Sequence, residues 1–134
     1  KEDHFWRDIL GFRPLWFGGQ HDGEINYVSS QVPDGTDWIE YMLNRSETPS
    51  ARSLGSMNHF SLGGAQMSDA VAALARNGCN GPECSKTQMG RDGKVQLNLF
   101  DPDLTRAEFM EFKPSGTTCC SPFTGPPPTE KENR

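Results

Sequence analysis

The chain lacks several features that would assign it to a class directly. It has no run of Lys or Arg and a formal net charge of −5, which argues against a surface built for nucleic acid or an anionic membrane. It has no stretch of eighteen apolar residues, so no segment is expected to span a bilayer. It begins at Lys1 without an initiator Met or a signal peptide, which indicates a processed or partial chain.

A Cys-x-x-Cys motif is also missing, and none of the four cysteines has a histidine nearby, so a zinc knuckle is not favoured. Disulfides are favoured instead, and they point to an oxidising, secreted or periplasmic location. Three connectivities are possible. Because Gly81 and Pro82 can turn the chain, we expect Cys79 and Cys84 to pair or lie close together. Adjacent cysteines such as Cys119 and Cys120 rarely bond each other, because the eight-membered ring strains the intervening peptide.

A single carboxylate stands among apolar residues in the segment 101–112. A turn at 101–103 precedes alternating residues that predict a strand. One face of this strand carries Arg106, Glu108, Met110 and Phe112, and the opposite face carries Glu111. A desolvated Glu108 would need a cation or a metal ion as partner, whereas a Glu on an edge strand would simply face water.

The remaining elements follow from periodicity and turn residues. A helix is predicted over 2–10, ended by Gly11, and a second over 69–77, capped by Ser68 and ended by Gly78. Strands are predicted over 12–17, 25–31, 37–43, 57–62 and 94–100, with one unplaced strand within 79–93. A polar linker covers 44–56.

The two halves of the chain form an internal repeat. The segment ending in Trp38-Ile-Glu-Tyr-Met42 matches the segment ending in Arg106-Ala-Glu-Phe-Met110. Glu108 follows Glu40 by 68 positions, and Gly78 follows Gly11 by 67. Each repeat is read as strand, helix and three strands, which predicts an α+β fold of two βαβββ modules forming a curved mixed sheet. The first strand of module one is absent from this chain.

Glu40, His59 and Glu108 occupy related positions in this repeat, and a curved sheet would bring them together. One imidazole and two carboxylates suit a divalent ion such as Zn, Ni, Co, Fe or Mn. Taken singly, His59 could equally be a core histidine and each Glu a solvated one.

Four segments resemble one known family: FWRDILGF at 5–12, DWIEY at 37–41, MNHF at 57–60 and DPDLTRAEF at 101–109. They are similar to the vicinal oxygen chelate superfamily, which includes glyoxalase I and the extradiol dioxygenases. The resemblance implies a domain over 1–113, with module one at 1–43, the linker at 44–56 and module two at 57–113. The block PDGTDWIEYML at 33–43 and the Pro-rich tail also resemble the second module of secreted two-module bacterial members.

The resemblance implies that Glu40, His59 and Glu108 are three of four metal ligands, with the fourth on the missing strand. The chain departs from the family pattern at Leu104, where a Gly normally shapes the turn, and at Gly63-Gly64, where a strand normally continues. A Glu at position 40 is closer to the glyoxalase I pattern than to the extradiol pattern of two His and one Glu.

Three functions remain open at this stage. The first is a metal-dependent, glyoxalase-like lyase or isomerase acting on a small oxygen-rich substrate, with Glu40 and Glu108 as catalytic carboxylates. The second is an iron-dependent extradiol-type dioxygenase. The third is a metal-free small-molecule-binding or assembly module on the same fold, without nucleic-acid or membrane partners.

Two further expectations concern the ends of the chain. An upstream module or a neighbouring chain would supply the missing first strand, so we expect a two-module chain or a homo-oligomer. The tail at 114–134 is rich in Pro, Ser and Thr and is expected either to form an extended strap or to stay mobile, with Phe123 as its only apolar anchor. Its removal is then expected to change thermal stability by only a few degrees.

Overall fold

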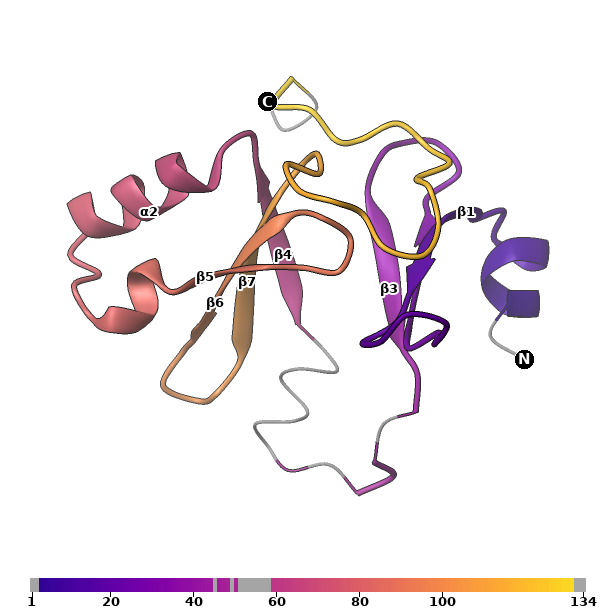
Figure 1. Ribbon diagram of the computed structural model, residues 1–134, viewed down its shortest axis with the longest axis horizontal. Coiled ribbons are helices and arrows are strands. Elements are labelled where there is room, and N and C mark those ends of the chain that lie inside the picture. Colours follow the sequence, from indigo (N-terminus) through magenta and orange to yellow (C-terminus); the bar gives the residue numbers. More distant parts are fainter. Residues whose placement is uncertain (1–2, 45, 49, 51–58, 132–134) are drawn as a thin grey trace.

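Two β-sheets, which we call sheet A and sheet B, form the molecule. The structure is a computed structural model that describes residues 3–44, 46–48, 50 and 59–131. Sheet A has the order β1-β2-β3 and sheet B the order β4-β7-β6-β5. Across Figure 1, α2, sheet B, sheet A and the N-terminal helix η1 follow one another, so that the two sheets form the centre.

Sheet A is an antiparallel meander. Its strands are β1 (Arg13–Gly18), β2 (Tyr27–Gln31) and β3 (Trp38–Met42), and Glu40 pairs with Ser29 of the central strand. The helix η1 (His4–Ile9) has π-helical geometry and precedes Gly11, whose φ of 76° confirms the left-handed residue expected after the helix. Trp6 of η1 hydrogen-bonds Tyr41, so the helix contacts the face of β3 opposite to Glu40.

Sheet B is the complete module. It contains β4 (Phe60–Gly64), the helix α2 (Met67–Arg76), a short 3₁₀ helix η2 (Pro82–Ser85), β5 (Thr87–Met89), β6 (Val95–Phe100) and β7 (Arg106–Glu111). β4 runs parallel to β7, and the other pairs are antiparallel. This βαβββ order confirms the predicted α+β fold class, and β5 is the strand that the sequence left unplaced.

In the described part of the chain, sheet A has no strand beyond β3, whereas sheet B has β4 beyond β7. The chain therefore carries one complete and one incomplete module, as the repeat predicted. Positions 57 and 58 of the expected strand 57–62, and most of the linker 44–56, lie outside the described residues.

Two local predictions around α2 and β4 need correction. Ser68 does not cap α2, because the helix begins one residue earlier, at Met67, with Gln66 in the capping position. The strand β4 continues through Gly63 and Gly64, where the departure from the family pattern suggested an interruption. A side chain at position 63 would meet the ring of Phe112 at 2.2 Å, so glycine there makes room for that ring.

The turn before β7 keeps its shape without a glycine. Leu104 adopts a φ of 68°, in the left-handed region that a side chain disfavours. The carboxylate of Asp101 accepts the N–H groups of Asp103 and Thr105 and so holds the turn together. Backbone strain at Leu104 is therefore offset by local hydrogen bonds.

The C-terminal tail forms an extended strap, defined here as residues 115–128, which Figure 1 shows crossing beside sheet A. Thr124 donates its N–H to the carbonyl oxygen of Leu15 in β1 (3.0 Å), and the N–H of Phe17 donates to Oγ of Ser121 (2.9 Å). The ring of Phe123 stacks on Trp16 with centroids 6.2 Å apart. Over residues 115–128 the structure therefore has the strap alternative.

Among the residues that the structure describes, as many polar as apolar residues are buried. The apolar group is Leu15, Trp16, Met67, Cys84, Leu97, Met110 and Phe112, and the polar group is Ser29, Ser30, Gln31, Asp92, Lys94, Glu108 and Glu111. Burying so many polar groups costs free energy unless each is paired or serves a site. The space between the sheets is thus the first place to look for function.

Candidate functional site

Glu108 lies at the centre of sheet B and contacts a histidine. The residue is 6% exposed, and its Oε2 lies 3.2 Å from Nε2 of His59. The parallel pairing of β4 with β7 places Ser61 beside Glu108 and His59 just before β4. The alternative of a solvated Glu on an edge strand is wrong, because β7 is flanked by β4 and β6.

An arginine from the same strand completes this cluster. Arg106 lies two positions before Glu108 and therefore on the same face of β7. Its Nη2 is 2.7 Å from Nδ1 and 2.5 Å from Nε2 of His59. The sequence analysis placed Arg106 on the same face as Glu108 but predicted no role for it. The structure shows that the partner of Glu108 is His59, which the guanidinium of Arg106 also contacts.

Glu40 occupies the related position in sheet A, yet its surroundings differ. Its Oε2 accepts a hydrogen bond from Oγ of Ser29 at 3.1 Å. Burial raises the pKa of Glu40 to about 7, and the negative charges of Asp92 and Glu108 add to the increase, while the Ser29 bond and Lys94 oppose it. Near neutral pH this carboxyl exchanges a proton readily, as a general base or acid requires.

A buried ion pair from the turn between β5 and β6 joins the two sheets. Nζ of Lys94 lies 3.9 Å from Oδ2 of Asp92, and it is 4.9 Å from the ring centroids of both Trp38 and Phe123. Burial lowers the pKa of Lys94, against the attraction of Asp92, Glu40 and Glu108. Burial likewise raises the pKa of Asp92, against the attraction of Lys94. Sequence analysis missed both residues, although the Asp-Gly-Lys turn before a clear strand was a usable signal.

We call the inner faces around Glu40, Glu108 and Lys94 the cup. The structure brings His59 and Glu108 into contact, and Glu40 lies near enough for its charge to interact with that of Glu108. The donor atoms of Glu40, His59 and Glu108 do not all lie within 4.8 Å of one another. Among the described residues, one trio of potential ligands meets that distance, namely Asp22, Cys119 and Cys120, and its two sulfurs are joined in a disulfide.

The donor chemistry of the cup fits a divalent ion. One imidazole and two carboxylates are common metal ligands, and Oδ1 of Asn98, which pairs across from Glu108, is buried without a hydrogen-bond partner among the described residues. Arg106 already occupies the place of a cation beside His59. An ion bound by His59 would therefore require the guanidinium to move away.

A small cavity of about 80 Å³ adjoins the cup beneath the strap. Its lining includes Trp38, Lys94, Phe112 and Phe123, together with the strap prolines at 126–128. Phe123 is therefore not the only apolar anchor of the tail, as the sequence had suggested. A larger and more open hollow of about 580 Å³ lies on the outer side of sheet B, beside α2, and includes Glu111 but no member of the cup.

Comparisons with known proteins give limited information about this chain. No protein-family model matches it, and no curated protein matches it. Two solved structures are similar: a lactoylglutathione lyase from Agrobacterium tumefaciens (13% identity, 81% of each chain covered, TM-score 0.33) and a glyoxylase/bleomycin resistance protein/dioxygenase domain from Frankia sp. EAN1pec (19% identity, 87% of this chain and 82% of that chain covered, TM-score 0.32). The functional argument therefore depends on the geometry of the cup.

Proposed function

We propose that the cup binds a divalent metal ion through Glu40, His59 and Glu108 and that the protein is a glyoxalase-like lyase or isomerase acting on a small oxygen-rich substrate. The observation that carries this proposal is the placement of the three donors on the cup: Oε2 of Glu108 lies 3.2 Å from Nε2 of His59, and Glu40 lies near enough for its charge to interact with that of Glu108. One imidazole and two carboxylates favour a divalent cation, and the carboxyl of Glu40, whose pKa burial raises to about 7, can also transfer a proton. A bound ion would polarise the substrate oxygens.

The residues of the chain have distinct roles in this proposal. His59, Glu108 and Glu40 would hold the ion, which would supply a positive charge for the substrate oxygens. Glu40 would also take a proton from the substrate carbon and return it. The strap with Phe123 keeps water from the Lys94 side of the cup. The two disulfides, Cys79–Cys84 and Cys119–Cys120, support a secreted or periplasmic location.

No observation of the cup specifically supports the alternative of an extradiol-type dioxygenase. It requires a second histidine at the position of the missing strand, because the other two of the chain, His4 and His21, are exposed on η1 and in the loop after β1. The structure describes no helix that is long and apolar enough to cross a membrane.

A metal-free binding module is favoured by one observation, the guanidinium of Arg106 against His59. In that case Arg106 and Lys94 would be the permanent cations of the cup and would bind an anionic small molecule. Substitution of Arg106 separates the two functions, because it frees His59 for an ion but removes a charge that an anion needs.

Titration calorimetry with Ni, Zn, Co, Fe and Mn tests the metal site. We expect one ion per chain, and we expect His59→Ala and Glu108→Ala each to weaken its affinity by about tenfold to a hundredfold or more, since few ligands remain. Arg106→Gln should tighten binding, by about tenfold if one charge repulsion is relieved. The controls His21→Ala and Glu24→Ala remove the same residue types from the exposed loop after β1.

Absence of stoichiometric binding by any of these ions contradicts the proposal. Loss of anion binding in Arg106→Gln, without any metal binding in the original chain, would instead establish the metal-free module. For the reaction itself, solvent-deuterium exchange at the carbon next to a carbonyl, followed by NMR, should depend on the ion and on Glu40. Glu40→Gln should abolish that exchange.

The missing first strand remains part of this proposal. A strand supplied by an upstream module or a neighbouring copy would pair with β3 on the side where the described residues place no strand, and would bring a fourth ligand beside Glu40. Light scattering and intact mass on the natural protein distinguish a neighbouring chain from a longer polypeptide. A monomer of these 134 residues that binds metal at full affinity would contradict this requirement.

A further inference from the structure

The two disulfides of the chain lie in contrasting surroundings. Cys79–Cys84 is the pair expected from the sequence; Cys84 lies in η2 and is 4% exposed, and Cys79 is half-buried. Cys119–Cys120 joins adjacent residues, contrary to the expectation that such neighbours rarely bond, and Cys120 is exposed. An exposed sulfur can be reached by an attacking thiolate, whereas a buried one is protected.

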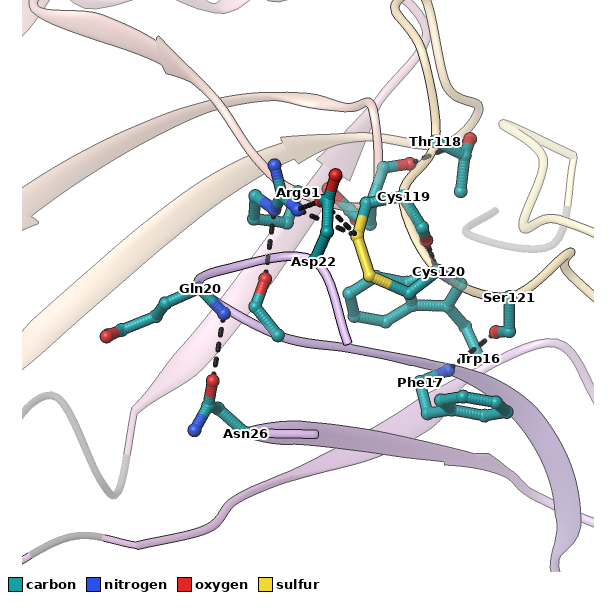
Figure 2. Close-up of a disulfide and its surroundings, with 12 residues drawn as sticks. Trp16, Phe17, Gln20, Asp22, Asn26, Arg91, Thr118, Cys119, Cys120 and Ser121 are labelled. Carbon is teal, nitrogen blue, oxygen red and sulfur yellow. Dashed lines mark hydrogen bonds and ion pairs between the residues drawn. A yellow bond between two sulfur atoms is a disulfide. The ribbon is translucent and has the colours of Figure 1, made fainter. Parts of the chain in front are cut away.

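A cation lies directly against the adjacent pair. Nη2 of Arg91 is 2.9 Å from Sγ of Cys119, and Figure 2 shows Arg91, Asp22 and this sulfur converging at one point. Arg91 is fixed there because its Nε donates to the carbonyl oxygen of Gly19 (2.9 Å) and its Nη2 pairs with Asp22. A guanidinium at this distance stabilises a thiolate on Cys119.

The adjacent pair also lies where the strap meets both sheets. The indole N–H of Trp16 in β1 donates to the carbonyl oxygen of Cys119 (3.0 Å), and the N–H of Cys119 donates to the carbonyl oxygen of Arg91 (2.9 Å). The next residue, Ser121, accepts the N–H of Phe17, as Figure 2 shows. Opening the disulfide would therefore change the chain at the point that holds the strap to β1.

The backbone of Cys120 gives a second reason for opening. Its φ is 80°, in the left-handed region that a residue with a Cβ rarely adopts, and such a conformation costs on the order of 1 kcal/mol or more. Once the ring is open, Cys120 is free to leave this region. The conformation is thus one that the disulfide and its neighbours maintain.

We propose that Cys119–Cys120 is a thiol–disulfide exchange site at which an external dithiol reversibly opens the attachment of the strap. The exposed Cys120 is the sulfur that is attacked, and Cys119 is the leaving group because Arg91 stabilises its thiolate. This site is separate from the cup and does not depend on the function proposed for it.

The chemistry balances without a further reactant. One thiolate of the dithiol forms a bond to Sγ of Cys120, the Cys119–Cys120 bond breaks, and Cys119 departs as a thiolate beside Arg91. The second thiol of the reductant loses its proton and attacks the sulfur of the first, which releases Cys120 as a thiolate. The dithiol becomes a cyclic disulfide, and the two cysteines are reduced by its two electrons.

Graded dithiothreitol treatment of the folded chain, followed by alkylation and peptide mass spectrometry, tests the proposal. The protein as isolated under oxidising conditions should contain the Cys119–Cys120 bond. This bond should be reduced at least about tenfold faster than Cys79–Cys84, given the difference in access. Equal rates for the two disulfides, or free thiols at 119 and 120 in the untreated protein, would overturn it.

Two substitutions of opposite effect identify the role of the charge. Arg91→Gln should slow reduction of Cys119–Cys120 about threefold or more, because the leaving thiolate loses its cation, and Arg91→Lys should keep most of the rate. Asp22→Asn, which removes a carboxylate 3.9 Å from Sγ of Cys119, should accelerate it. Identical rates in Arg91→Gln and Asp22→Asn would contradict the mechanism.

The reduction rate of Cys79–Cys84 reports in each variant whether the fold is intact. Arg13→Gln is the matched control. Arg13 also hydrogen-bonds loop carbonyl oxygens, those of Val32 and Gly35, but it lies at the start of β1 and has no contact with Cys119 or Cys120 among those described. Its rate should equal that of the unmodified chain, and a slowing as large as that of Arg91→Gln would overturn the specific role of Arg91.

Discussion

Glu40 and Glu108 are related by the internal repeat, yet the two sheets give them different partners. Glu108 in sheet B contacts His59, which comes just before β4, and His59 in turn contacts Arg106. Glu40 in sheet A has the hydroxyl of Ser29 as its hydrogen-bond partner among the described residues, and its pKa is raised to about 7. The same residue in the same position of the repeat therefore contacts a histidine in one sheet and a serine hydroxyl in the other.

The difference follows from how each sheet is completed. β4 lies beside β7 and brings a histidine to Glu108, whereas β3 has no described neighbour on the corresponding side. Sheet A is stabilised instead by the strap on the opposite edge, along β1. Because neighbouring groups set the pKa of a buried carboxyl, a cation or a further strand beside β3 would stabilise the charge of Glu40 more than that of Glu108.

The largest test removes the strap from sheet A. Truncation after Lys113 deletes the contacts of Phe123 with Trp16 and the hydrogen bonds to β1 and Gln31. At about 1 kcal/mol for each hydrogen bond, plus the lost apolar burial, we expect a loss of about 5 kcal/mol and a fall in Tm of about 10–20 °C. The sequence alone had suggested a fall of only a few degrees. Differential scanning calorimetry measures the change in Tm.

A shorter truncation provides the control for the strap. Removal of residues 129–134 leaves every contact named for the strap in place, so Tm should stay within a few degrees. If truncation after Lys113 caused an equally small change, the strap would not hold sheet A, and the difference between the two sheets would need another cause.

The second test concerns how sheet B holds its helix. Glu111 faces away from the cup, where its Oε1 accepts the N–H of Met67 at the start of α2 and its Oε2 accepts from Val95 and Ser115. Although burial acts to raise the pKa of Glu111, these hydrogen bonds hold it below its usual range. We expect Glu111→Ala to cost about 3 kcal/mol, because three donors lose their acceptor.

The pH dependence of that loss has a definite sign. Because the pKa of Glu111 is lower in the folded state, its contribution is present above the pKa of the unfolded chain and is lost as pH falls through the folded value. Urea unfolding of Glu111→Ala at pH 7 and at pH 3 should show a larger deficit at pH 7. An equal deficit at both pH values would show that ionisation of Glu111 does not matter.

Three sequence patterns, namely strand alternation, the internal repeat and a Gly-Pro turn, made predictions that the structure confirms. Alternation separated Glu108 from Glu111 on β7, and the structure places one in the cup and the other beneath α2. The repeat located the incomplete module, and the Gly81-Pro82 turn located the Cys79–Cys84 disulfide. Alternation and turns depend on neighbours in sequence, and the repeat depends on similarity between two segments, so one sequence reveals all three.

Contacts between segments that are distant in the chain could not be predicted from the sequence. Asp92 and Lys94 enter the cup from a tight turn, and their role depends on where sheet A lies relative to that turn. The adjacent cysteines bond within a backbone held by Trp16 and Arg91, which are far away in sequence. The identification of Glu40, His59 and Glu108 as metal ligands remains a prediction.

The comparison of the two glutamates is tested most directly by measuring the unfolding free energy of Glu40→Gln and Glu108→Gln at pH 5 and pH 8. Burial raises the pKa of folded Glu40 to about 7, whereas the unfolded chain releases this proton near the ordinary pKa of 4.5, so stability falls as pH rises between these values. Glu40→Gln should therefore stabilise the protein by about 2 kcal/mol at pH 8 and change little at pH 5. Glu108→Gln should destabilise it by about 1–3 kcal/mol at pH 8, because Nε2 of His59 loses the carboxyl oxygen that it contacts. Destabilisation of similar size by both substitutions at pH 8 would contradict the account.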